Sequence, residues 1–171
     1  MKDTSRVKRW VRRITIAIAL LFAALASGAF LLARTDGPMF VFAGGPFRSG
    51  EQVDFADLDW ESLDALHELE LEIVGEASSL ILWFSVHEGV PYVACDLDCI
   101  DGLLPRWPQQ IERDNRVVIR IDEKRVDGLL IHVPHASAEY RDVRAGRTRK
   151  YSGDEGGRAA AETSAHHAVV D

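Results

Sequence analysis

An arginine and a tryptophan stand side by side at Arg106-Trp107, and a second arginine follows at Arg113. Such a set can hold a ligand that carries both a negative charge and a flat ring. The guanidinium bonds acidic oxygens, and the indole offers an aromatic face. The alternative is structural: the tryptophan closes one end of the fold and the arginines are solvated. The sequence leaves both interpretations open.

Arginines also recur at Arg113, Arg116 and Arg120, across the start of an expected strand. They could form a groove for an anion. The favoured interpretation is a solvent-facing surface on which they pair with some of the many carboxylates.

The chain has two cysteines, Cys95 and Cys99. In an oxidising compartment this pair can close a small disulfide, and two separate thiols are the alternative. His166 and His167 would complete a set of two cysteines and two histidines, but the spacing is unlike that of zinc fingers. The sequence therefore predicts no metal site.

Charge divides the 171-residue chain into two unlike parts. Residues 1–34 hold seven Lys or Arg and one acid, whereas the rest holds 13 Lys or Arg and 26 acids. An acidic domain is repelled by a phosphate backbone and gains nothing from counterion release. We therefore expect no nucleic-acid partner.

The 20 residues from Ile14 to Ala33 carry no charge. A helix of that length spans about 30 Å, which matches the hydrocarbon core of a bilayer. Six basic residues precede the segment and only Arg34 follows it closely, so the positive-inside rule keeps the N-terminus in the cytoplasm. The expected location is the cytoplasmic membrane, crossed once, with the C-terminal domain outside the cytoplasm. A cleaved signal peptide ending near Ala24-Leu25-Ala26 is the less favoured alternative.

The rest of the chain predicts a small domain built from β-hairpins. Leu80 to Val86 and Val90 to Cys95 form one expected hairpin, and Val117 to Ile121 and Arg125 to Val133 form another. Further strands are expected at Met39 to Ala43, ended by a Gly44-Gly45 turn, and at Leu69 to Val74. Expected short helices lie within Asp54 to Leu66, within Leu103 to Arg113 from about Pro108, and over Ser137 to Lys150. His166 to Val170 is either a last strand that closes the sheet or a frayed tail.

The predicted fold class is mainly β (α+β): an N-terminal transmembrane helix followed by a small antiparallel barrel with short helices. The expected boundaries are a basic N-terminus over 1–13, the transmembrane helix over 14–33 and a linker over 34–38. A barrel domain over 39–152 and a polar C-terminal segment over 153–171 follow.

Several motifs stand in an order that resembles the flavin-binding split-barrel, or pyridoxamine 5'-phosphate oxidase-like, superfamily. They are Gly37-Pro38, Gly44-Gly45, Asp59-Trp60, LWFSVHEGVPYVA from Leu82, Trp107, IERDNRVVIRID from Ile111, and RKYSG from Arg149. The order is most similar to a membrane-anchored bacterial branch. The resemblance implies a Greek-key split barrel that forms a homodimer and binds flavin mononucleotide or a deazaflavin at the dimer interface. It implies Tyr92, Arg106, Trp107 and Arg113 as cofactor-binding residues and leaves catalytic residues unassigned.

Two functions follow as expectations. The first is a membrane-anchored, flavin- or deazaflavin-dependent oxidoreductase whose substrate is not indicated. The second is a cofactor-free module, tethered to the bilayer, that dimerises or binds a small ligand. Asp96, Asp98 and Asp101 favour the second, because three carboxylates repel a cofactor phosphate.

Overall fold

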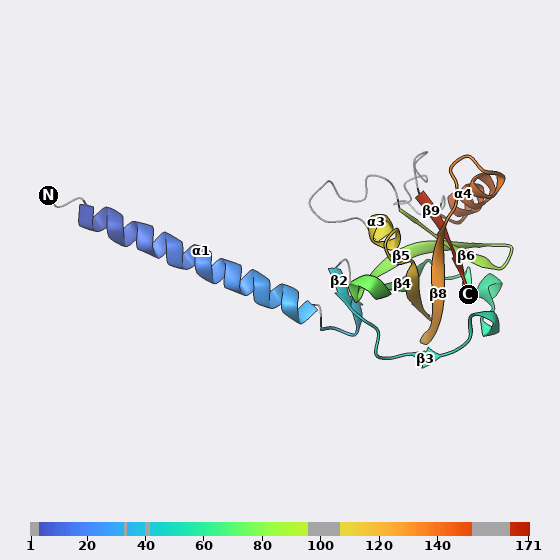
Figure 1. Ribbon diagram of the computed structural model, residues 1–171, viewed down its shortest axis with the longest axis horizontal. Helices are drawn as coiled ribbons and strands as arrows, with labels where there is room; N and C mark the ends of the chain where they lie inside the picture. Colours follow the sequence, from blue (N-terminus) through green and yellow to red (C-terminus); the bar gives the residue numbers. More distant parts are fainter. Residues whose placement is uncertain (1–3, 33, 40–41, 96–106, 152–164) are drawn as a thin grey trace.

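A long apolar helix leads into the domain and stands apart from it (Figure 1). The computed structural model describes residues 4–32, 34–39, 42–95, 107–151 and 165–171. Helix α1 runs over Thr4–Leu32, and all side chains from Lys8 to Leu31 are exposed. This stretch of 24 residues is long and apolar enough to cross a membrane. The helix begins ten residues before the predicted uncharged segment, because the basic residues that precede it continue the same helix.

Six strands form a closed antiparallel barrel, which confirms the predicted fold class. The strands are β4 (Glu68–Ile73), β5 (Ser78–His87), β6 (Val90–Cys95), β7 (Arg116–Ile121), β8 (Lys124–His132) and β9 (Ala165–Val170). Their order around the barrel is β5-β4-β7-β8-β9-β6, and β6 pairs with β5 to close the ring. This order is a Greek key, because β6 pairs with β5 and with β9, the last strand, and not with β7, the next strand along the chain.

The last strand is what closes the barrel. β9 pairs with β6 on one side, Val93 opposite His167, and with β8 on the other, His132 opposite His167. The apolar ending of the chain is therefore a strand and not a frayed tail. The predicted C-terminal segment 153–171 accordingly contains one strand of the barrel.

The barrel interior is filled by alternate residues of its strands. Leu71, Ile119 and Val126 are fully buried there, with Phe84 and Val93. The opposite face of β5 is also apolar and is partly covered. Trp83 stacks on Tyr151 with ring centroids 5.1 Å apart.

The short helices lie close to their predicted positions. They are α2 (Trp60–Leu63), α3 (Trp107–Ile111) and α4 (Ala138–Tyr151), with single 3-10 turns η1 (Phe55–Asp57) and η2 (Val74–Glu76). A two-residue strand, β3 (Glu51–Gln52), runs parallel to the start of β8. Helix α4 packs on the outside of the barrel against β5 (Figure 1).

The prediction for the first strand was wrong. In place of one strand over Met39 to Ala43, the structure has a hairpin of β1 (Gly37–Met39) and β2 (Phe42–Gly45). Gly44 lies inside β2 and not in a turn. A Cβ atom at Gly44 would stand 1.8 Å from the carbonyl oxygen of Gly37, so only glycine allows this close approach of the two strands.

Candidate functional site

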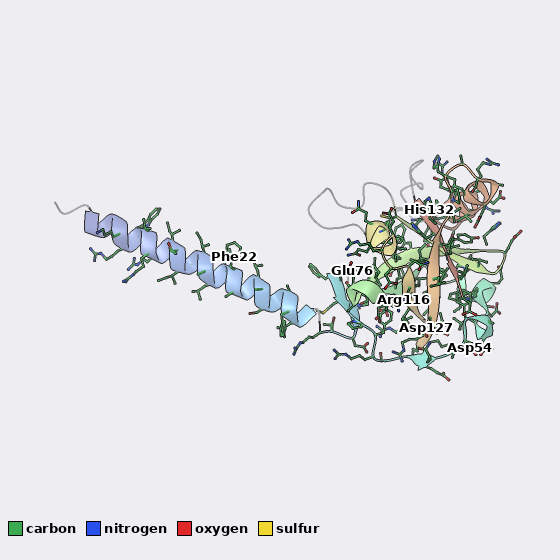
Figure 2. All side chains as sticks on the ribbon, in the orientation of Figure 1. Phe22, Asp54, Glu76, Arg116, Asp127 and His132 are labelled. Carbon is green, nitrogen blue, oxygen red and sulfur yellow. The ribbon has the colours of Figure 1, made fainter. Side chains whose placement is uncertain are left out.

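A cavity of about 300 Å³ opens at one end of the barrel, between α3 and the ends of β7 and β8. It lies at the His132 end of β8, and Asp127 lies toward the other end of that strand (Figure 2). The mouths of β-barrels are frequent small-molecule sites. The lining residues are Pro108, Ile111, Glu112, Arg113, Asn115, Leu130, His132 and His167.

Aromatic rings from three separate elements meet beside this cavity. The indole of Trp107, on α3, lies 5.1 Å from the imidazole of His167, on β9. The imidazole of His132, on β8, lies 5.2 Å from the same ring in an edge-to-face arrangement. Register explains the meeting, because His132 and His167 are direct cross-strand partners and so point to the same face.

His167 is the most unusual group in this wall. Its side chain is only 5% exposed, and its Nδ1 atom has no hydrogen-bond partner among the residues that the structure describes. Burial, and in second place the nearby His132, lower the pKa of His167 to about 4. The imidazole is therefore neutral at pH 7, and it lines the cavity while its Nδ1 atom is buried.

The rim of the cavity supplies polar groups. The side chain of Arg113 is 66% exposed and pairs with Glu76 at 3.5 Å. Because this contact is long and exposed to solvent, the guanidinium can still bind an acidic group of a ligand. Asn115 is fixed by the bond from its Nδ2 to the carbonyl oxygen of Leu130, 3.3 Å away. Glu112 also lines the cavity, so the rim is of mixed charge.

A larger open groove of about 890 Å³ lies on the other side of the barrel, beside β3 and β4. Its central cation is Arg120, which is already engaged. Its Nε donates to Glu70, and its Nη1 donates to Asp36 at 3.1 Å and to Ser49 at 3.0 Å. Five carboxylates line the groove, from Glu51, Glu68, Glu70, Asp122 and Glu123. Among the described residues that line this groove there is no aromatic ring, whereas His132 and His167 line the barrel mouth, so we take the mouth as the candidate site.

The structure brings part of the predicted cofactor-binding set to the mouth. Trp107 forms the back of its aromatic wall, and Arg113 stands at its rim. Tyr92 points to the opposite face of β6, where its hydroxyl donates to Glu139 on α4 at 3.0 Å. Burial there, together with Glu139, raises the pKa of Tyr92 to about 12. Arg106 lies outside the described residues, and the roles of all four residues stay predictions.

The predicted ion pairing of the three arginines is confirmed. Arg113 pairs with Glu76, Arg116 with Asp114 at 2.7 Å, and Arg120 with Glu70 and Asp36. Whether Cys95 and Cys99 form a disulfide or remain two separate thiols is not tested, because Cys99 lies outside the described residues. So does the acidic stretch with Asp96, Asp98 and Asp101.

Sequence reasoning missed the two histidines of the mouth. His132 was interpreted only as a strand residue, and His167 only as a distant member of a zinc-like set. A usable signal was present: His132 continues the inward alternation of Val126 and Leu130, and His167 that of Val169. A histidine at the end of a strand, on its inward face, is a candidate residue for a binding site at the mouth of the barrel.

No family model and no curated protein matches the chain. Two crystal structures have a similar fold in part. A protein assigned as a pyridoxamine 5'-phosphate oxidase from Listeria innocua has 14% identity and a TM-score of 0.44 over 63% of this chain and 86% of its own. An FAD-binding protein from Mesorhizobium loti has 11% identity and a TM-score of 0.41 over 64% of this chain and 83% of its own. At these values we draw no function from either protein.

Proposed function

We propose that this protein is a membrane-tethered binding module, whose barrel is held outside the cytoplasm and takes a small ligand at its mouth. The observation that carries the ligand site is the cavity at the mouth, which is lined by the imidazoles of His132 and His167 and has Arg113 at its rim. The helix α1, exposed along its apolar length, supports the tether.

The chemistry of the mouth narrows the ligand class. The rings of His132 and His167 favour a flat ligand, and the guanidinium of Arg113 favours an acidic group. The cavity is at the lower end of the size range of small-molecule sites. The expected ligand is therefore a small molecule with one ring system and one acidic group.

Flavin-dependent oxidation and reduction is the second candidate function. The indole and imidazole wall favours it, since a flavin is flat and aromatic. The phosphate of a flavin mononucleotide fits less well. Among the described residues that line the cavity, Arg113 is the one arginine or lysine, and Glu112 stands next to it. The described residues of one protomer thus do not make a phosphate cradle, and we derive no redox step from them.

A homodimer is the proposed assembly. Apolar side chains on the outside of the barrel support it, with Trp83 39% and Ile131 45% exposed on β5 and β8. Mass photometry of the full chain in nanodiscs checks this, with the dimer mass as the expected result and the monomer mass as the contrary one.

Three probes test the binding site in the full chain, purified in detergent: flavin mononucleotide, riboflavin and inorganic phosphate. Calorimetric titration is expected to show binding of at least one probe, and His167→Phe is expected to weaken it about tenfold or more, a change of about 1.4 kcal/mol. The matched control is His87→Phe, because His87 lies outside the cavity. If the wild-type chain binds none of the three probes, the proposal of a ligand site at the mouth is refuted. If it binds riboflavin or flavin mononucleotide and gains a flavin absorbance band, the second candidate gains support.

A further inference from the structure

The β1–β2 hairpin carries exposed apolar side chains at the edge of the barrel that faces α1 (Figure 1). Met39 is 42% exposed and Phe42 is 60% exposed, and they are cross-strand partners. Neither side chain lies in the two core clusters. Large apolar side chains of this kind, presented together, mark a surface that meets another apolar phase.

The distance from the membrane helix limits what that phase can be. Five residue steps separate Leu32, the last residue of α1, from Gly37, the first of β1, which allows at most about 17 Å. The hairpin base is also held to this connection. The hydroxyl of Thr35 donates to the carbonyl oxygen of Gly37 at 2.8 Å and accepts from the amide of Gly45 at 3.4 Å. The hairpin therefore cannot move far from the end of α1.

The end of α1 has the composition of a membrane interface. The guanidinium of Arg34 lies over the ring of Phe30, 4.2 Å from its centroid. Arginine and aromatic side chains at the end of an apolar helix are interfacial anchors. We infer that the β1–β2 hairpin, through Met39 and Phe42, inserts into the interfacial layer of the bilayer beside α1. This inference rests on the proposed membrane anchoring.

The force that holds the hairpin is apolar burial and not charge. The part of the chain after residue 34 is strongly acidic, so anionic headgroups would repel it. Insertion of Met39 and Phe42 is therefore expected in a purely zwitterionic bilayer, without any anionic lipid. This behaviour would distinguish the hairpin from a basic patch, which binds anionic lipids through its charge.

The test places one nitroxide label at a time on p-acetylphenylalanine in the full chain, in phosphatidylcholine nanodiscs. Collision with oxygen, which is enriched in lipid, is compared with collision with a water-soluble nickel chelate. Position 42 is expected to favour oxygen. Phe22 in the middle of α1 is the positive control, and Asp54, exposed on the barrel away from α1 (Figure 2), is the aqueous control.

The outcomes separate the hairpin from the anchor. If position 22 favours oxygen while position 42 favours nickel, the hairpin inference is overturned and the anchor stands. If position 42 is protected from both reagents, protein covers it, by a second copy or another partner, and the inference is again overturned. If position 22 favours nickel, the anchoring itself fails and the inference with it. If position 42 favours oxygen in phosphatidylcholine alone, apolar insertion is supported, and if it does so only after phosphatidylglycerol is added, apolar insertion is contradicted.

Discussion

Arg120, on strand β7 of the barrel, is joined to Asp36, in the segment that follows helix α1, by an ion pair of 3.1 Å. A second bond runs from Nη2 of Arg120 to the carbonyl oxygen of Asp36 at 3.3 Å. Hydrogen bonds from Ser49 and from the backbone of Arg48, and then the charge of Arg120, lower the pKa of Asp36 to about 2. The connection between α1 and the barrel is thus fixed by a charged contact.

Removal of this guanidinium is expected to destabilise the barrel. Arg120→Leu leaves Glu70 and Asp36 without their cation and removes the guanidinium from the ring of Phe47, 4.4 Å away. The side chain of Arg120 is 14% exposed, so the expected loss is about 2 kcal/mol in the free energy of unfolding, measured in urea on the full chain in micelles. Arg116→Leu is the control, since its side chain is 64% exposed, and it should change that energy by less than about 0.5 kcal/mol. Equal effects of the two variants would refute the structural role of Arg120.

Two glycine substitutions are expected to have opposite signs. Gly44→Ala forces a Cβ atom against the Gly37 carbonyl and should cost about 2 kcal/mol or more. Gly146→Ala, in helix α4, meets nothing within 4 Å and should add about 0.5 to 1 kcal/mol, because alanine restricts the unfolded chain. Thermal unfolding of the two variants in the same micelles checks both signs. A Gly44→Ala chain as stable as wild type would contradict the close approach of β1 and β2.

The free energy of unfolding is expected to decrease as the pH is lowered through a defined window, because of His167. Its pKa is about 4 in the fold against 6.5 for the free group, so the unfolded chain binds the proton first as the pH falls. The native state therefore loses stability between pH 6.5 and pH 4, on the order of 3 kcal/mol. His167→Phe should flatten this dependence in urea unfolding at a series of pH values. The contribution of Asp36 to stability is lost at lower pH, between 3.8 and about 2, so the effects of the two groups can be separated. An unchanged pH profile in His167→Phe would remove His167 as its source.

The barrel strands could be predicted from sequence because each carries its own signal. Ile119 and Ile121 alternate with polar residues, and two-residue turns such as Asp122-Glu123, with φ of 49° and 62°, fix the hairpin register. The β1–β2 hairpin was missed because Gly44 looks like a turn residue, whereas its role is to let two strands approach closely. Only its close approach to the carbonyl oxygen of Gly37, seven residues earlier, shows that role.

The candidate site was harder to predict for a different physical reason. Trp107, His132 and His167 come from three distant parts of the chain and meet only when β9 closes the barrel. Trp107 and Arg113 are indicated both by their chemistry and by the family resemblance, and both lie at the mouth. Tyr92 is indicated by the resemblance alone, and the alternation of β6 directs it to the other face, under α4.

The central claim is that α1 tethers the barrel to a membrane with the barrel outside the cytoplasm. The most direct test is protease access in intact spheroplasts of bacteria that express the full chain with a C-terminal epitope. The account predicts that the chain resists extraction with alkaline carbonate, and that external protease removes the epitope without lysis of the cells. A chain released by carbonate, or an epitope protected until the membrane is broken, would contradict the account.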